Sequence, residues 1–160
     1  MTLEDFSEIR KRIKDEGKKL VFTNGCFDII HRGHIEYLIQ AKSLGDYLIV
    51  AINSDESVRK IKGNSRPINN EEDRMYVLEN LKPVDFVIIF KEDTPYEIIK
   101  NIMPDILVKG GDWKVDDIVG SDIVNANGGK TLSLKYVKDY STTNVIRKLN
   151  ELNQQNECPK

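Results

Sequence analysis

The two histidines of this chain, His31 and His34, lie three residues apart in a loop that follows an apolar run. Two residues placed at random in a chain of this length would have that spacing in roughly 1% of cases. A glycine, Gly33, stands between them and lets an anion approach the backbone. His34 is expected to open a helix, whose free N–H groups and partial positive charge attract anions. The pattern therefore predicts a phosphate-binding turn with two imidazole donors.

Two other interpretations of the histidine pair are a turn with incidental histidines and a metal site. Zinc needs three or four ligands, and the chain has neither an HExxH pattern nor a pair of neighbouring cysteines. Cys26 and Cys158 are too far apart for a CxxC motif. Because Cys26 lies in the histidine loop, we interpret it as a loop residue whose backbone faces a ligand, without a redox role.

A second polar turn begins at Tyr140 and continues with Ser141, Thr142 and Thr143. Serine and threonine are preferred at the first position of a helix, so these residues predict a helix start. Hydroxyl groups at a helix start also suit a phosphate. Simple capping is the alternative interpretation of this turn.

A third loop, after the apolar run 106–108, reads Lys109, Gly110, Gly111, Asp112 and Trp113. Paired glycines expose backbone groups to a planar ligand, and a tryptophan beside them can stack on that ligand or cover it. The alternative is an ordinary turn into a helix, with Trp113 in the core.

A fourth loop of mixed charge covers residues 53–67 and begins with Asn53 and Asp55. It leads to Lys62 and Arg66 through a stretch that also contains glycine, serine and proline. Such a loop is often only solvated. Beside a phosphate site, however, it is expected to close over the phosphates of both substrates.

The elements that must position these loops alternate regularly along the chain. Apolar runs predict strands over 20–22, 47–52, 86–90, 106–108 and 131–137. Helical spacing and helix stop signals predict helices over 3–16, 34–44, 70–81, 95–102, 115–126 and 142–152. Buried strands that alternate with amphipathic helices favour an α/β fold, a doubly wound, Rossmann-like sheet of five parallel strands with helices on both faces. In such sheets ligands bind beyond the carboxyl ends of the strands.

The composition fits one globular domain over 1–160, with an N-terminal helix over 1–17, a core over 18–150 and a flexible tail over 153–160. The chain of 160 residues has 24 Lys and Arg against 26 Asp and Glu, a net charge of −2. That balance argues against a nucleic-acid partner. Apolar runs are too short to span a bilayer, and the charged N-terminus does not resemble a secretory signal. We therefore expect a cytoplasmic protein without a membrane partner.

The segment GCFDIIHRGH resembles the HxGH signature of the nucleotidyltransferases that include the cytidylyltransferases and pantetheine-phosphate adenylyltransferase. In that superfamily an S-T/S-T helix start faces the HxGH turn, as STT over 141–143 would here. The resemblance implies transfer of a nucleotidyl group from a nucleoside triphosphate to a phosphate acceptor, with release of pyrophosphate. It also implies that His31 and His34 contact the triphosphate and stabilise charge on the α-phosphate. That role agrees with phosphoryl chemistry, which depends on positioning and charge stabilisation.

Six segments over about 18–150 together resemble the adenylyltransferases that form ADP-heptose, often the C-terminal half of a bifunctional heptose kinase/adenylyltransferase. They are FTNGCFDIIHRGH, LGDYLIVAINSD, KGNSRPIN, EDTP, DILVKGGDW and YSTTNVI. The resemblance implies ATP and D-glycero-β-D-manno-heptose 1-phosphate as substrates, Mg²⁺ bound mainly through the ATP phosphates, a separate sugar kinase and a possible homodimer. A glycerol-3-phosphate cytidylyltransferase is the nearest alternative. A non-catalytic nucleotide sensor and a class I aminoacyl-tRNA synthetase fragment are the others.

The resemblance also distributes roles over the candidate site. The expected catalytic residues are His31, His34 and Lys62. The expected nucleotide-binding residues are Thr23, Asn24, Gly25, Cys26, Phe27, Gly33, Lys109, Gly110, Gly111, Asp112, Tyr140, Ser141, Thr142 and Thr143. The expected residues for the acceptor are Asp28, Asn53, Asp55, Arg66, Arg74 and Lys82. Asp28 has two expected roles, to orient the sugar or to hold Mg²⁺, and an exposed ion pair on a helix is the alternative for Arg74.

Overall fold

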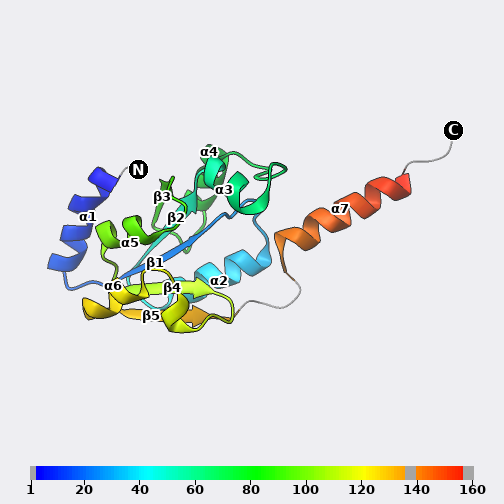
Figure 1. Ribbon diagram of the computed structural model, residues 1–160. Coiled ribbons are helices and arrows are strands. Elements are labelled where there is room, and N and C mark those ends of the chain that lie inside the picture. Colours follow the sequence, from blue (N-terminus) through cyan, green and yellow to red (C-terminus); the bar gives the residue numbers. More distant parts are fainter. Residues whose placement is uncertain (1–2, 136–139, 157–160) are drawn as a thin grey trace.

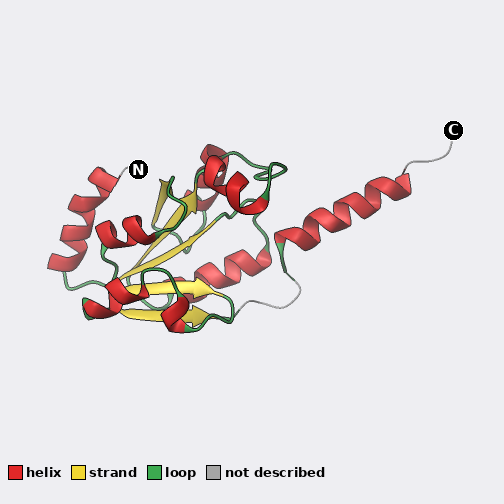
Figure 2. Cartoon of the chain, in the orientation of Figure 1, coloured by secondary structure: helices red, strands yellow, loops and turns green. Residues whose placement is uncertain are grey.

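The computed structural model describes residues 3–135 and 140–156, the last four of these by their backbone only. Five parallel strands form one sheet in the order β3-β2-β1-β4-β5. This confirms the predicted doubly wound α/β fold (Figure 2). The strands are β1 (Leu20–Gly25), β2 (Tyr47–Asn53), β3 (Phe86–Phe90), β4 (Ile106–Gly110) and β5 (Lys130–Leu134). The chain leaves β3 and returns to the far side of β1, so the strand order reverses between β1 and β4. A ligand site is expected beyond the carboxyl ends of these two strands.

Helices cover both faces of the sheet and form two apolar cores (Figures 1 and 2). On one face, α1 (Leu3–Asp15), α5 (Tyr96–Ile102) and α6 (Ser121–Ala126) contribute side chains to the first core. On the other face, α2 (Arg32–Lys42) and α4 (Glu71–Glu79) contribute to the second. The strand interiors are buried on both sides, which explains their continuous apolar runs.

The residues expected to form a basic loop after β2 instead begin with a helix, α3 (Asp55–Lys62). Ser54 caps it, since its hydroxyl accepts a hydrogen bond from the Ser57 amide. Acidic residues occupy the first turn and basic residues the last, an order that favours the helix dipole. Lys62 therefore stands at the end of a helix, and only residues 63–70 form the loop that reaches α4.

The helix expected over 115–126 is divided in two. A short 3₁₀ turn, η1 (Val115–Asp117), is separated from α6 by Gly120, which has a φ of +88°. A Cβ atom on Gly120 would lie only 2.7 Å from Cδ1 of Ile99, so this position requires glycine both for its backbone conformation and for space. Helix α2 also begins earlier than expected, at Arg32, so His31 occupies its N-cap position.

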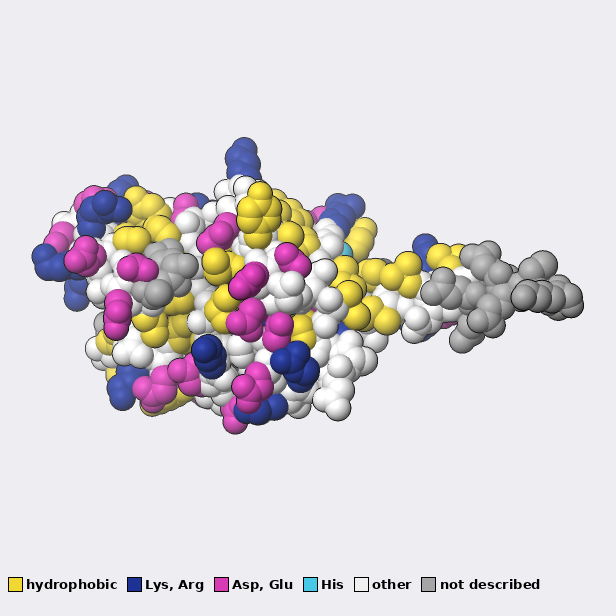
Figure 3. Space-filling model, turned by 90° about the horizontal axis from the view of Figure 1, so that it is seen from above, with side chains coloured by type: hydrophobic (Ala, Val, Ile, Leu, Met, Phe, Trp, Pro, Cys, Tyr) yellow, Lys and Arg dark blue, Asp and Glu magenta, His cyan; other side chains and the backbone are white. Residues whose placement is uncertain are grey.

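The last helix, α7 (Thr142–Asn156), extends away from the body of the molecule (Figures 1 and 3). It continues beyond the predicted end at 152 and into the segment expected to be a tail; residues 157–160 of that segment lie outside the described residues. Residues 136–137 of the predicted fifth strand lie outside them too, and β5 itself ends at Leu134. Within the described ranges, no helix is both long and apolar enough to span a bilayer.

Candidate active site

The two imidazoles lie at the carboxyl edge of the sheet, at the start of α2. Their rings stack with centroids 3.8 Å apart and an interplanar angle of 18°. His31 is the N-cap of α2, and its side chain makes no capping hydrogen bond. The start of the helix is therefore left without a side-chain cap beside the two rings. This is the arrangement expected for an anion site at a helix N-terminus.

The hydroxyl-bearing turn before α7 lies against this histidine turn, although about 110 residues separate them in the sequence. A Cβ atom on Gly33 would lie 2.8 Å from Cβ of Tyr140, so the Tyr140 side chain packs directly against the glycine. Thr142 Oγ1 donates a hydrogen bond to the carbonyl oxygen of Ile29 at 3.4 Å. Ser141 caps α7 by accepting a hydrogen bond from the Asn144 amide. The predicted meeting of the two turns is thus present, and Ser141 also acts as a cap.

Both histidines are held neutral by their surroundings. Burial, and then the neighbouring His31, lower the pKa of His34 to about 4, although a backbone hydrogen bond at Ile29 acts in the opposite direction. Burial also lowers the pKa of His31. Neither Nδ1 atom has a hydrogen-bond partner among the residues that the structure describes. Near neutral pH each ring is therefore an uncharged group with one N–H to donate.

Four basic side chains lie around Cys26, next to the histidines. Burial raises the pKa of its thiol, while the positive charges of Lys62, Arg74, Arg66 and Lys109 act to lower it. The Cys26 thiol is 3.9 Å from Oδ1 of Asn53, the last residue of β2. Cys26 therefore lies where the ends of β1 and β2 meet a group of cations.

Two of these four cations are neutralised by carboxylates, the buried Asp28 and the half-buried Asp55. Arg66 pairs with Asp28, which also accepts hydrogen bonds from the amides of Ile68 and Asn69 at 2.9 Å. Burial alone would raise the pKa of Asp28, but these amides and Arg66 lower it overall. Arg74 pairs with Asp55 at 2.9 Å. The oxygens of Asp28 are thus occupied by the segment before α4.

The other two cations, Lys62 and Lys109, have no acidic partner among the described residues. Lys109 donates to Oδ1 of Asn24 at 3.2 Å. Burial, and then the charge of Lys62, lower its pKa. A mostly buried ammonium group with one neutral acceptor is incompletely paired, and a polyphosphate would supply the missing charge. The surplus positive charge of this site therefore comes from the two lysines.

Several expected site residues have structural contacts instead. Thr23 is buried, and its hydroxyl lies 2.6 Å from the Tyr37 hydroxyl in the core. The Asn53 amide donates to Ser57 at 3.0 Å. Trp113 is 52% exposed, so the alternative that placed it in the core is wrong; its indole donates to the Gly110 carbonyl.

Arg74 and Lys82 differ most from expectation. Arg74 is only 1% exposed, so the alternative of an exposed ion pair on a helix is wrong. All three nitrogens of its guanidinium group donate to protein acceptors, so the group is held inside the protein. Lys82 is exposed in the turn that precedes β3, and the start of a parallel strand lies at the edge opposite to the site. The structure does not bring Lys82 to the other residues.

Sequence reasoning missed Asn69, which connects the two ion pairs. Its backbone and side-chain amides donate to Asp28, and its carbonyl oxygen accepts from Arg74 at 3.1 Å. It also missed Glu71, which accepts a hydrogen bond from the Asp55 amide at 2.6 Å. No local pattern signals either residue, because Asp28 and Asp55, the partners of Asn69 and Glu71, lie 41 and 16 positions away in the sequence.

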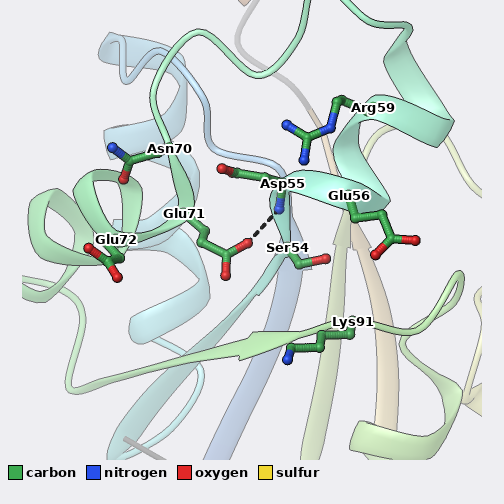
Figure 4. Close-up of a pocket in the computed structure, with 8 residues that line it drawn as sticks. All are labelled: Ser54, Asp55, Glu56, Arg59, Asn70, Glu71, Glu72 and Lys91. Atoms are coloured by element: carbon green, nitrogen blue, oxygen red, sulfur yellow. Dashed lines mark hydrogen bonds between the residues drawn. The ribbon is translucent and has the colours of Figure 1, made fainter.

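A pocket of about 420 Å³ lies beside the site, at the ends of β2 and β3 (Figure 4). Figure 4 shows Arg59 and Lys91 on opposite sides of it, with the Asp55–Glu71 contact between them. Asp55 belongs both to this pocket and to the Arg74 network. The lining residues are Ser54, Asp55, Glu56, Arg59, Asn70, Glu71, Glu72 and Lys91.

The neutral imidazoles make the stability of the fold depend on pH. His34 titrates near pH 4 when folded but at about 6.5 when unfolded, so the unfolded chain takes up the proton first as the pH falls. The contribution of neutral His34 to the free energy of unfolding is complete above pH 6.5 and is lost as the pH falls towards 4. Between pH 7 and 5 we expect the free energy of unfolding to fall by about 2 kcal/mol. Urea unfolding at the two pH values measures it.

The control for this prediction is His34→Gln, which removes the titrating group. Its free energy of unfolding should change much less between pH 7 and 5. An equal loss in the variant would contradict the assignment to His34. Carboxylates with lowered pKa values, such as Asp28, change the free energy of unfolding only below about pH 4, where they take up protons. They therefore do not contribute to the change between pH 7 and 5.

A neutral histidine pair, an uncapped helix start and two lysines without an acidic partner among the described residues lie at the switch point of this α/β sheet. This arrangement is typical of enzymes that act on polyphosphates. The model of the cytidylyltransferase-like family matches residues 22–148, and the chain belongs to this family. It is therefore a nucleotidyltransferase.

Curated relatives extend the match over nearly the whole chain. Proteins named "Bifunctional protein HldE" from Aliarcobacter butzleri and from Marinomonas are 51% and 54% identical over 150 and 147 residues. These matches cover 94% and 92% of this chain but 31% of each relative. The chain thus spans about a third of the length of the curated relatives it matches.

Solved structures agree with the fold. The lipopolysaccharide core biosynthesis protein from Thermoplasma volcanium is 33% identical, has a TM-score of 0.63 and matches 78% of this chain and all of its own. A pantothenate synthetase from Thermus thermophilus matches 90% of this chain and 65% of its own at a TM-score of 0.57. Its identity is 13%, so this second likeness concerns the fold alone.

Proposed function

We propose that this chain transfers the adenylyl group of ATP to the phosphate of D-glycero-β-D-manno-heptose 1-phosphate, which forms ADP-heptose and pyrophosphate. The observation that supports these substrates is the identity of 51–54% to proteins named HldE over 92–95% of the chain. That name fits the bifunctional heptose kinase/adenylyltransferases that the six motifs resemble. The similar protein from Thermoplasma volcanium is a lipopolysaccharide core biosynthesis protein, which is in keeping with the same pathway.

The proposed reaction is an in-line displacement at the α-phosphate of ATP. An oxygen of the acceptor phosphate attacks the phosphorus, and the bond to the pyrophosphate oxygen breaks as the new bond forms. His31, His34 and the helix start at 141–143 donate hydrogen bonds to the oxygens that gain charge. No protein nucleophile or general base is needed, because the acceptor phosphate is already an anion.

The lysines are proposed to bind the phosphates. Lys109 and Lys62 are the unpaired cations of the site, and they suit the triphosphate and the leaving pyrophosphate. Arg66 is paired with Asp28, so a phosphate must compete with that carboxylate for it. We therefore assign Arg66 a secondary role, at the acceptor.

Mg²⁺ is proposed to enter with ATP, where it neutralises charge on the phosphates. Among the described residues there is no cluster of three or more His, Cys, Asp or Glu side chains placed to hold a metal ion. The Asp28 oxygens fit a metal poorly, because Arg66 and two backbone amides already donate to them. A metal held mainly by the substrate agrees with both observations. The acceptor, a sugar 1-phosphate, would be the product of a sugar kinase reaction.

A pyrophosphate-release assay tests the proposal. The four nucleoside triphosphates are combined in turn with heptose 1-phosphate, glycerol 3-phosphate and phosphopantetheine. Release only with ATP and heptose 1-phosphate supports it. Release with CTP and glycerol 3-phosphate would replace it by the cytidylyltransferase alternative. ATP binding without release from any acceptor would favour a nucleotide sensor.

The phosphate role of Lys109 predicts a binding defect. Lys109→Met keeps the length of the side chain but removes its charge, so we expect the KM for ATP to rise about 10–100-fold. Stability should not fall, because the ammonium group is mostly buried and incompletely paired. Lys62→Met should act in the same direction but less, because Lys62 is exposed. Initial rates at varied ATP measure both variants.

Lys130→Met is the matched control. Lys130 is an exposed lysine at the start of β5, at the opposite edge of the sheet. The KM for ATP of the Lys130→Met variant should equal that of the unmodified protein. An unchanged KM in Lys109→Met would exclude the proposed phosphate contact.

A further inference from the structure

Arg74 is the largest fully buried side chain of the described residues, and it binds backbone. It donates to the carbonyl oxygens of Cys26 at 2.6 Å, Asn53 at 2.8 Å and Asn69 at 3.1 Å. These oxygens belong to the loop after β1, the end of β2 and the segment before α4. Asp55 balances the charge. An arginine that donates hydrogen bonds to three backbone carbonyls fixes the three segments relative to one another.

The Cys26 carbonyl is the contact closest to the chemistry. It belongs to the peptide that precedes Phe27, and Phe27 has a φ of +46°, in the left-handed region. That conformation is unfavourable for a residue with a Cβ atom, which keeps it only where neighbouring contacts impose it. The Arg74 bond holds the peptide on one side of this residue.

The ring of Phe27 connects that backbone conformation to a histidine. Its centroid is 5.2 Å from the centroid of His34. The ring also packs against Gly25, where a Cβ atom would lie 3.0 Å from the ring. The ring therefore contacts both Gly25 and His34, and it contributes to the burial that keeps His34 neutral.

We propose that Arg74 is a positioning residue for His34. It holds the Cys26 peptide, which holds Phe27 in the left-handed region, and the Phe27 ring in turn fixes the imidazole. The kinetic part of this inference rests on the proposed function, whereas the link from Arg74 to His34 does not involve a substrate. Arg74 thus acts on the transfer step and makes no contact with either substrate.

The first test is Arg74→Lys, which retains the charge beside Asp55 but cannot reach three carbonyl oxygens with one nitrogen. We expect kcat to fall about 10–100-fold, with the KM of both substrates within about 3-fold of normal. Loss of a contact made equally to the bound substrate and to the transition state would instead raise a KM. A rise in the KM of either substrate with kcat unchanged would therefore overturn the proposal.

The second readout needs no activity. NMR titration of the imidazole protons gives the pKa of His34, and the spectrum contains two histidines, which His31→Gln distinguishes. In the unmodified protein the pKa is about 4. In Arg74→Lys it should rise towards 6.5, because Phe27 moves and water reaches the ring. This readout keeps its meaning if the proposed substrates prove wrong.

Arg10→Lys is the matched control. Arg10 is a partly buried arginine that donates to the carbonyl oxygens of Ile102 and Met103 and pairs with Asp105 at 3.2 Å. It extends from α1, on the other face of the sheet. Its replacement should lower stability but leave kcat and the His34 pKa unchanged. If Arg74→Lys behaves in the same way, the positioning role is wrong.

Phe27→Leu tests the same link if Arg74→Lys does not fold. It removes the ring and leaves the Arg74 hydrogen bonds in place. The His34 pKa should rise and kcat should fall, as in Arg74→Lys. The double variant, where it folds, should lose no more activity than the more affected single variant, because both changes break one chain of contacts. A His34 pKa that stays near 4 in Phe27→Leu would overturn the inference.

Discussion

Replacing His31 by alanine is expected to lower kcat by about 10²–10³-fold, the effect of removing one preorganised donor from a developing oxyanion. The ring stacks on His34 at 3.8 Å and lies at an uncapped helix start. The His31 ring therefore has a fixed position. Because it makes no capping hydrogen bond, its removal breaks none. The KM for ATP should change less than kcat, because the hydrogen bond strengthens as charge develops. Steady-state kinetics with pyrophosphate detection measure both constants.

His31→Asn is the companion variant, since its amide retains an N–H donor on a shorter side chain. We expect a smaller loss of kcat than in the alanine variant. Circular dichroism and thermal unfolding should show both variants folded. A kcat close to normal in the alanine variant would remove His31 from the transfer step.

Gly33→Ala is expected to lower kcat/KM by about 100-fold or more, although it adds a single methyl group. The new Cβ atom would lie 2.8 Å from Cβ of Tyr140 and 3.2 Å from the His31 ring. Both distances are too short, so the Tyr140 turn and the histidine turn must separate. The phosphate would then lose one wall of its site. Kinetics and a nucleotide-binding titration measure the loss.

A second substitution tests this explanation directly. Tyr140→Gly removes the Cβ atom that collides with the alanine, so the double variant should recover part of the activity that Gly33→Ala loses. Tyr140→Phe keeps that atom and should give no recovery. Recovery in both double variants, or in neither, would contradict a steric cause at Tyr140.

Much of the fold was predictable because its elements are encoded locally. The run Phe86–Phe90 is apolar and bounded by turn residues, and it forms β3 with the predicted limits. Helix α3 was missed because its lysines suggested a solvated loop. The Ser54 cap and the acidic first turn were the signals that indicated a helix.

The site was predictable in part. The histidine and hydroxyl turns each carry a local pattern, and their meeting followed from the resemblance. The roles of Arg74 and Arg66 were not predictable, because burial and pairing depend on residues up to 48 positions away. Lys82 shows a different limit. Its charge suggested a phosphate contact, but its place before a strand puts it at the wrong edge.

The uncharged state of the two imidazoles has a consequence for turnover. Neutral donors align a polyanion and strengthen their hydrogen bonds as charge develops, yet they add no net attraction for the anion that departs. Two imidazolium groups in the same place would hold pyrophosphate tightly and slow its escape. In the proposed reaction, unprotonated rings would therefore assist the breaking of the bond to pyrophosphate without delaying the release of pyrophosphate.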